Sequence, residues 1–313
     1  LAQIIPIALQ PILRRIFDPS DFGLFAIYST LLGIIVAIAT LKYESTVMLP
    51  RKDEDAANLV VGSVLIALLM SLIICFVFYL FGSEIISYFD LPSEMSDWLL
   101  ILPISIFIFS AYQVMNYWLI RKKAYKVSSF NKVVRRGAEG GVQWGAGMFI
   151  PKSGLIIGNI VGDLVNFLTG IIQLKRTGIN LKWIKKVKII ALMKRYKDFP
   201  LYSTLPAFLN TLSVSVPVLL INKFYGEEVT GYFDLSRMVL ALPLALVSVS
   251  ISQVLFQNLS ERIREQMTIR PLILKTAKML GLVAIVMVVA GYFFSVPVFK
   301  FVFGERWETS GVM

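Results

Sequence analysis

Apolar runs without a single charged residue recur along this chain, and each approaches or exceeds the length that crosses a lipid bilayer. A transmembrane helix needs about 20 predominantly apolar residues. Six uncharged runs meet this requirement: Leu24–Leu41, Asn58–Ser83, Trp98–Ile120, Phe199–Asn222, Met238–Ser260 and Met279–Phe299. Because lipid offers the backbone no hydrogen-bond partners, such runs must be helical. The sequence therefore predicts an all-α, polytopic membrane protein.

Two weaker runs extend this set. Gly140–Pro151 is short and can span only if its helix continues through Glu139 into the basic segment before it. Ser153–Leu174 is long enough but carries Asp163. The chain also begins and ends inside apolar stretches that are too short to span. We therefore expect nine helices and the start of a tenth, belonging to a fragment of a longer protein.

The formal net charge of +11 must be located before it is interpreted, because a basic soluble protein would suggest nucleic acid. If the helices alternate across the membrane, one set of loops holds 23 Lys and Arg against 6 Asp and Glu: Pro50–Ala57, Arg121–Arg136, Lys175–Asp198 and Glu261–Lys278. The other set holds 6 against 10: Arg14–Asp21, Gly82–Asp97, Pro151–Lys152, Lys223–Glu228 and Lys300–Glu308. Short basic loops stay cytoplasmic. The first set and the N-terminus are thus predicted to be cytoplasmic, and no nucleic-acid partner is expected.

Several kinds of chemistry lack the residues that they need. The chain has no His and one Cys, Cys75, which lies inside an apolar run. This excludes His-based general base catalysis, Cys/His metal sites and internal disulfides. The longest loop of the acidic set, Gly82–Asp97, has 16 residues and is too short for an external catalytic domain. We expect a protein that is not an enzyme, with no catalytic residues, metal or cofactor.

The basic stretch Lys175–Asp198 separates the helices into two groups. It mixes Lys and Arg with Ile, Leu and Trp183, which is typical of a helix lying on an anionic leaflet. A plain linker between two halves of the protein is equally compatible. The predicted organisation is an N-terminal lobe at 1–174, a basic cytoplasmic linker or amphipathic helix at 175–198, and a C-terminal lobe at 199–313.

An internal repeat supports this division. A shift of 208 residues places Gly23-Leu24-Phe25 on Gly231-Tyr232-Phe233, with a cation and an aromatic residue before each copy. Parallel repeats of this kind are related by an axis along the membrane normal, with the transport pathway between the halves. Chance similarity between apolar hairpins is the alternative.

Ionisable residues inside the helices are candidates for function, because a charge at the bilayer centre costs at least ~2.5–3.5 kcal/mol. Lys42 lies about 13 Å along a helix from Arg51, which favours a hydrated cavity over an interfacial role. Lys42 and Glu44 are roughly 200° apart around a helix, so we expect that they do not pair with each other. Asp163 has no cation on its own helix and is a candidate for proton or ion coupling. A satisfied interhelical hydrogen bond is its alternative.

The other charges have local partners or lie near a helix end. Asp234 and Arg237 share a helix face at i,i+3, as a structural ion pair or a ligand site. Glu139 is expected to pair with Arg135 or Arg136 near the cytoplasmic interface. Arg14 and Arg15 lie at the outer end of the first helix, where they either snorkel or contact an anion.

Several segments together carry a family resemblance. They are Arg15-Ile-Phe-Asp-Pro19-Ser-Asp-Phe-Gly23-Leu-Phe, Leu41-Lys42-Tyr43-Glu44, Pro50-Arg-Lys-Asp-Glu-Asp-Ala56, Gln143 with Gly154-Leu-Ile-Ile-Gly158, and Phe303-Gly304-Glu-Arg-Trp307. In this order and spacing the chain resembles the Wzx-type polysaccharide or O-antigen flippases. These form a branch of the superfamily that includes the multidrug (MATE) exporters and the lipid II flippase.

The resemblance implies a MATE-like two-lobe bundle of roughly 12 to 14 transmembrane helices around a central cavity, of which this chain would hold nine to ten. It implies movement of undecaprenyl-diphosphate-linked oligosaccharides from the cytoplasmic to the outer leaflet by ion-coupled alternating access, for O-antigen, capsule or exopolysaccharide synthesis. The implied partners are that substrate, a coupling proton or sodium ion, membrane lipids and a polysaccharide polymerase. The implied location is a bacterial or archaeal plasma membrane.

The resemblance also implies that cations in the cavity bind the diphosphate or acidic sugars. Lys42 stands where many relatives have Arg, so it keeps the charge but loses bidentate phosphate geometry. The substrate-binding candidates are Lys42, Arg237, Arg14 and Arg15, and the residues themselves point to Asp163, Glu44 and Asp234 for ion coupling.

Three other functions remain open at this point. A drug or cation exporter of the same superfamily would favour acidic residues in the N-terminal cavity, where Lys42 and the basic end of the first helix stand. A membrane-embedded glycan polymerase or ligase would need a substantial external loop. A receptor or scaffold would not need the charges within the helices.

Overall fold

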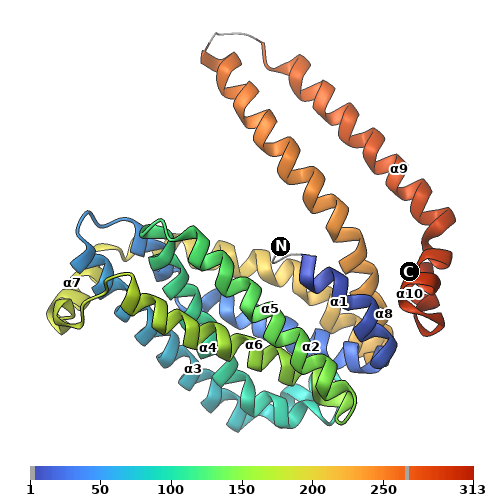
Figure 1. Cartoon of the computed structure of the whole chain (residues 1–313), viewed down its shortest axis with the longest axis horizontal. Helices are drawn as coiled ribbons and strands as arrows, with labels where there is room; N and C mark the ends of the chain where they lie inside the picture. Colours follow the sequence, from blue (N-terminus) through green and yellow to red (C-terminus); the bar gives the residue numbers. More distant parts are fainter. Residues whose placement is uncertain (1–3, 265–267) are drawn as a thin grey trace. The chain divides into compact units, whose positions relative to one another are not determined.

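The computed structural model describes residues 4–264 and 268–313, without the side chains of 4–7, 151, 242–254, 256–264 and 290. The described secondary structure is helical (Figure 1): α1 Ile4–Ile16, α2 Pro19–Ala39, η1 Tyr43–Met48, α3 Asp53–Phe89, α4 Met95–Arg121, α5 Tyr125–Gly147, α6 Pro151–Arg176, η2 Leu181–Trp183, α7 Lys186–Arg195, α8 Asp198–Arg264, α9 Arg270–Phe303, η3 Glu305–Trp307 and α10 Glu308–Val312. Two compact units, Leu1–Gly231 and Tyr232–Met313, are described separately below.

The membrane prediction is confirmed by the lengths of these helices. In the described part of the chain, six helical segments are long and apolar enough to cross a membrane. Helix α8 contains two of the predicted spans, Phe199–Asn222 and Met238–Ser260. Gly226 lies between them, and its backbone is not helical (φ 82°, ψ 176°). Helix α5 runs without a break from Tyr125 to Gly147, so it continues through Glu139 as a span at this place requires.

Helix α2 begins with a well-defined cap and ends earlier than the apolar run suggests. The backbone N–H of Asp18 donates to the Asp21 carboxylate (3.0 Å), and Pro19 occupies the first turn. The helix ends at Ala39, and Leu41 and Lys42 adopt left-handed conformations with φ of 49° and 60°. The expectation of a helix reaching Leu41 was wrong, because the chain turns here into η1.

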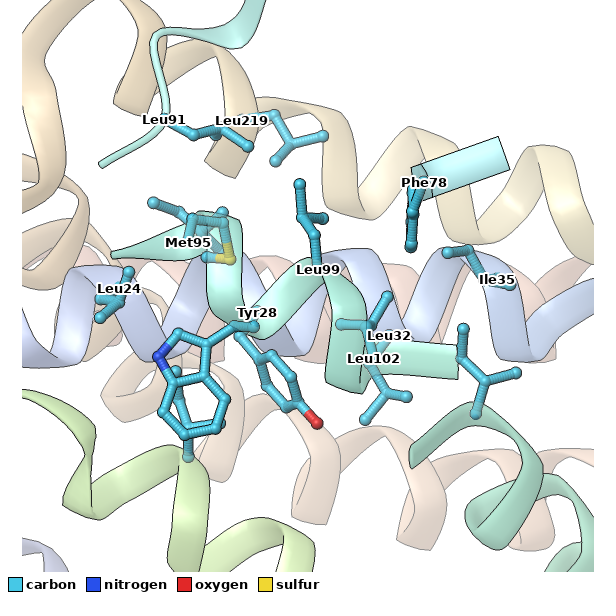
Figure 2. Close-up of a cluster of buried hydrophobic side chains, with 14 of the residues drawn as sticks. Leu24, Tyr28, Leu32, Ile35, Phe78, Leu91, Met95, Leu99, Leu102 and Leu219 are labelled. Carbon is cyan, nitrogen blue, oxygen red and sulfur yellow. The ribbon is translucent and has the colours of Figure 1, made fainter. Parts of the chain in front are cut away.

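Of the two hydrophobic clusters formed by the described residues of the first unit, one lies between α2 and α4. Figure 2 shows Leu24 and Tyr28 of α2 facing Leu99 and Leu102 of α4. All four side chains are buried. The Tyr28 hydroxyl donates a hydrogen bond to Ser105 Oγ (2.7 Å), which satisfies both polar groups inside this apolar layer.

The outer surface of α3 is apolar and exposed. Leu65, Leu69, Leu72 and Phe76 have exposed fractions between 52% and 62%. A face this apolar is unfavourable in water over several turns. It is the surface expected of a helix that contacts lipid.

Helices α2 and α8 meet inside the first unit through two glycines. A Cβ atom at Gly23 would lie 1.8 Å from the carbonyl oxygen of Glu227, and one at Gly231 would lie 1.9 Å from that of Pro19. Real Cβ atoms do not approach a carbonyl oxygen this closely, so only glycine fits at either place. The two backbones therefore touch directly, near the first turn of α2.

The second unit joins the start of its α8 segment to the C-terminal elements. Trp307 is fully buried, with its ring 5.9 Å from that of Tyr232. Ser236 Oγ donates to the carbonyl oxygen of Ser310 (2.6 Å). The chain reverses between α9 and η3 at Gly304, whose φ of 104° favours glycine.

Candidate functional site

A buried ion pair joins the middle of α6 to the middle of α5. Asp163 lies 12 residues after the start of α6 and is 2% exposed. Arg135 Nε of α5 lies 2.7 Å from Asp163 Oδ1. The Arg135 guanidinium also lies 5.5 Å from the centre of the Phe109 ring of α4. Three helices of the first unit therefore contribute to one buried charged group.

A second pair lies one turn further along α5. Arg136 Nη1 is 2.8 Å from Glu139 Oε2, as the local pairing predicts. Glu139 is itself buried, and Asn159 Nδ2 of α6 donates to its other oxygen, Oε1, at 3.4 Å. Gln143 Nε2 donates to the carbonyl oxygen of Leu155 (3.1 Å), so the polar contacts extend toward the turn between the two helices.

The spacing of the sequence explains why these side chains meet. Residues four apart lie on one helix face, which aligns Asn131, Arg135, Glu139 and Gln143 on α5. The facing side of α6 carries Asn159, Asp163 and Asn166, with Gly158 just before Asn159 and Gly162 just before Asp163. At Gly162 an added Cβ would lie 2.9 Å from Glu139 Cβ, so the glycine lets the two polar faces approach.

This polar cluster has more acceptor atoms than the surrounding protein satisfies. Among the described residues, the buried atoms Asp163 Oδ2, Asn159 Oδ1 and Asn131 Oδ1 have no hydrogen-bond partner. Buried polar atoms without partners are costly, so they are retained where a proton, a water or a cation supplies the missing contact. The described residues contain no group of three carboxylate, Cys or His side chains placed to hold a metal ion.

Lys42 and Glu44 lie together, which corrects one prediction. Lys42 Nζ is 3.8 Å from Glu44 Oε1, although the two were expected to face apart. The expectation assumed that α2 continues through them, whereas the left-handed turn at Lys42 brings the side chains to one side. Glu44 is 2% exposed and accepts a hydrogen bond from Thr40 Oγ1. The distance of Lys42 from Arg51 along one helix is likewise wrong, since η1 intervenes.

The two arginines at the end of α1 have different surroundings. Arg14 is 1% exposed, donates from Nε to Gln10 Oε1 (3.1 Å) and lies 3.9 Å from the centre of the Phe22 ring. Arg15 is exposed. Arg14 thus packs within the first unit, and Arg15 is the more accessible cation.

Asp234 and Arg237 lie in the second unit. Their nearest charged atoms, Asp234 Oδ1 and Arg237 Nη2, are 3.6 Å apart at i,i+3. The ion pair that the spacing allows is therefore formed. Both side chains stay partly exposed, at 21% and 39%.

Arg135 was not among the predicted site residues, although the sequence contained the signal. Its segment was counted as a basic loop. A span that must end near Gly147 and needs about 20 residues has to start near Tyr125, and Arg135 then falls at its centre. Asn159 and Asn166 were missed because uncharged polar residues are common in membrane helices.

Three comparisons relate the chain to known proteins. A family model described as "Polysaccharide biosynthesis protein" matches residues 12–311. The teichuronic acid biosynthesis protein TuaB of Bacillus subtilis (strain 168) is 26% identical over 115 residues, which are 37% of this chain and 24% of that protein. The chain thus matches about a quarter of the length of this curated relative.

A solved structure matches the whole chain. It is described as an inward-facing conformation of a multidrug resistance MATE family transporter of the MOP superfamily. The TM-score is 0.74 at 16% identity, with coverage of 100% of this chain and 74% of that one. The chain has the MATE transporter fold, as the resemblance implied.

Proposed function

We propose that this chain, which belongs to the polysaccharide biosynthesis protein family, flips undecaprenyl-diphosphate-linked oligosaccharide repeat units from the cytoplasmic to the outer leaflet. The observation that carries the proposal is the family match over residues 12–311 on a chain with a MATE transporter fold. A protein that has a transporter fold and takes part in polysaccharide biosynthesis is expected to move a sugar-bearing substrate across the membrane. Lipid-linked repeat units are the form in which such cargo reaches the bilayer.

Transport would proceed by exchange between two states that open to opposite sides of the membrane. Each ligand shifts that equilibrium only by its difference in affinity for the two states. The backbone contact of Gly23 and Gly231 closes α2 against α8 on the side of the acidic loops, so this contact has to part when that side opens. We place the basic loops in the cytoplasm, following their excess of Lys and Arg.

The coupling ion would act at Asp163. Its carboxylate is held by Arg135, and its Oδ2 atom is available to a proton or a sodium ion. Neutralising Asp163 would weaken the attraction to Arg135 and so loosen α6 from α5. A membrane potential adds about 2.3 kcal/mol per charge per 100 mV to such a step. Glu44 and Asp234, each beside a cation, are secondary candidates.

The substrate would be held by cations. Arg15 is exposed, and Arg237 is partly exposed beside Asp234, so both can exchange an internal contact for a phosphate oxygen. Lys42 is 26% exposed and lies 3.8 Å from Glu44, a loose pair that a phosphate can replace. Arg14 is buried on Phe22, which supports a positioning role at the end of α1.

A drug or cation exporter of the same superfamily is the second candidate. The buried acids Glu139 and Asp163 favour it, because such a cargo requires negative charge. Each of these acids already faces an arginine, however, and the pairs are close to neutral together. Because these pairs leave little net negative charge to hold a cation, they favour the anionic cargo over a cationic one.

The two candidates are separated by complementation in a host that lacks its own flippase, with expression from the full-length gene. We expect surface polysaccharide to return with a cognate repeat unit, and no gain in drug resistance. Asp163→Asn, Lys42→Ala and Arg237→Ala should reduce the product, whereas Lys132→Ala, at an exposed site on α5, should not. Failure to restore polysaccharide with any cognate unit, or resistance without polysaccharide, overturns the proposal.

A further inference from the structure

The short helix α7 is fixed to the start of α3 on one side. Its buried residues Ile189 and Leu192 face α3, and an added Cβ at Gly62 would lie 3.1 Å from Ile189 Cγ2. Lys188 Nζ forms an ion pair with Glu54 Oε1 at 2.6 Å. The position of α7 is thus determined by side-chain packing and by a charge pair.

Hydrogen bonds between side chains and the backbone of this segment fix it as well. Asn58 donates from Nδ2 to the carbonyl oxygen of Trp183 (2.8 Å) and accepts from the backbone N–H of Lys185 at Oδ1 (2.9 Å). The Tyr43 hydroxyl donates to the carbonyl oxygen of Met193 (3.0 Å). The segment from η2 to the end of α7 is therefore part of the first unit and not a loose connection.

These contacts place α7 at the level where α3 becomes apolar. Its partners on α3 run from Glu54, in the charged first turn, to Gly62. The exposed apolar face of α3 begins at Leu65, three residues beyond Gly62. If α3 spans the membrane, α7 therefore lies at the height of the lipid headgroups on that side.

The outward face of α7 has the polarity and the charge expected of a surface at the lipid headgroups. Val187, Ile190, Ala191 and Lys194 are exposed and lie at i, i+3, i+4 and i+7, on one stripe. Val187 is 80% exposed, and Leu181 of η2 is 75% exposed. Lys182, Lys186 and Lys194 surround them and have no ion-pair partner among the residues that the structure describes.

We propose that the outward face of η2 and α7 binds the anionic headgroups of the adjacent leaflet. Val187, Ile190 and Leu181 enter the boundary between headgroups and acyl chains, while the three lysines contact lipid phosphates. The occupant is the leaflet itself, because exposed apolar side chains and exposed lysines lie together on this face, as a surface at the lipid headgroups requires. The inference concerns how the first unit is held in the membrane, and it goes beyond the proposed cargo.

A fluorescent reporter on the full chain tests this surface. Exposed Cys75 is replaced in a Cys75→Ser background, and Val187→Cys is labelled with a dye whose emission depends on polarity. The protein is reconstituted into nanodiscs of phosphatidylcholine, with or without phosphatidylglycerol. We expect emission at shorter wavelength and lower access to aqueous iodide with phosphatidylglycerol, and we expect added salt to reduce the difference.

The charge dependence is tested with matched variants. Lys182→Gln, Lys186→Gln and Lys194→Gln together should abolish the effect of phosphatidylglycerol. The control carries Lys123→Gln, Lys126→Gln and Lys132→Gln, three exposed lysines before and within α5, and should keep the effect. The proposal is overturned if iodide access is the same with and without phosphatidylglycerol. It is also overturned if both triple variants lose the effect of phosphatidylglycerol to the same extent. Elution of each variant as folded protein, checked by size exclusion, keeps these outcomes interpretable.

Discussion

Gly23 and Gly231 occupy equivalent places in one contact, because the shift of 208 residues that relates them also relates their partners. Gly23 approaches the carbonyl oxygen of residue 227, and Gly231 approaches that of residue 19. The two halves of the contact are therefore interchanged by the same shift, as in an interface around a two-fold axis. A chance resemblance between apolar hairpins does not require this reciprocity, so the contact supports the internal repeat.

Alanine at either glycine should destabilise the protein by a similar amount. The added methyl group would lie within 2 Å of a carbonyl oxygen, and overpacking of this kind costs about 1–3 kcal/mol. Gly33→Ala on the same helix α2 is the control, because its Cβ would meet nothing within 4 Å. It should be neutral or slightly stabilising. The measurement is the unfolding free energy in detergent, and equal stability of all three variants would contradict the contact.

The buried ion pair should show strong coupling between its partners. Arg135→Met or Asp163→Leu alone leaves one buried charge unpaired, at a cost of about 3–5 kcal/mol. The double variant should lose less than the sum of the two, because it leaves no unpaired charge. Denaturant unfolding of the four proteins gives the coupling energy directly, and additive losses would argue against the pair.

The exposed pair of Glu94 and Lys152 provides the contrast. Lys152 Nζ lies 2.7 Å from Glu94 Oε1, with side-chain exposures of 71% and 39%. Exposed pairs are worth about 0–1 kcal/mol. The same double-variant cycle with Glu94→Gln and Lys152→Met should therefore give a coupling energy several times smaller than that of Arg135 and Asp163.

This exposed pair also predicts a pH dependence. The hydrogen bond from Lys152 holds the pKa of Glu94 below its ordinary value. The carboxylate thus stabilises the fold above its unfolded pKa of about 4.3, and the contribution is lost as the pH falls through the lower folded value. The wild-type protein should exceed Glu94→Gln in melting temperature at neutral pH, and the small difference should vanish in acid. A difference in melting temperature that grows in acid would contradict a lowered pKa of Glu94 in the folded protein.

Substitutions of Lys42 should separate its backbone role from its charge. A left-handed conformation is unfavourable for a residue with a Cβ by about 1 kcal/mol, and Lys42 has φ 60°. Lys42→Gly should therefore unfold at a higher temperature than Lys42→Ala. In the complementation assay both should lose activity, and Lys42→Arg should retain it. Equal melting temperatures for glycine and alanine would show that the turn rearranges.

The spans were predictable because hydropathy over about 20 residues depends on the solvent of the helix and not on its neighbours. The pairing of Glu139 with Arg136 and of Asp234 with Arg237 also followed from the sequence, because i,i+3 spacing is local. Contacts between helices were not predictable in this way. Asp163 meets Arg135 only because the turn between α5 and α6 aligns their centres, which no window along one helix reveals.

The error at Lys42 has a different cause. Apolar periodicity indicates where a helix lies but places its end poorly, and two left-handed residues were enough to reverse the geometry of Lys42 and Glu44. The division at 1–174, 175–198 and 199–313 stays a prediction. The two compact units of the structure separate between Gly231 and Tyr232.

The attachment of α7 to α3 limits how α8 can travel. Lys175–Asp198 contains 24 residues, and as a random coil it would have a mean reach of about 27 Å. Helix α7 ends at Arg195 and α8 begins at Asp198, so only two residues connect them. Fully stretched, that connection permits about 10 Å. As long as α7 stays bound to α3, the first turn of α8 cannot move farther than this connection allows. Helix α8 can therefore rotate about its first turn, but it cannot slide a long way past α3.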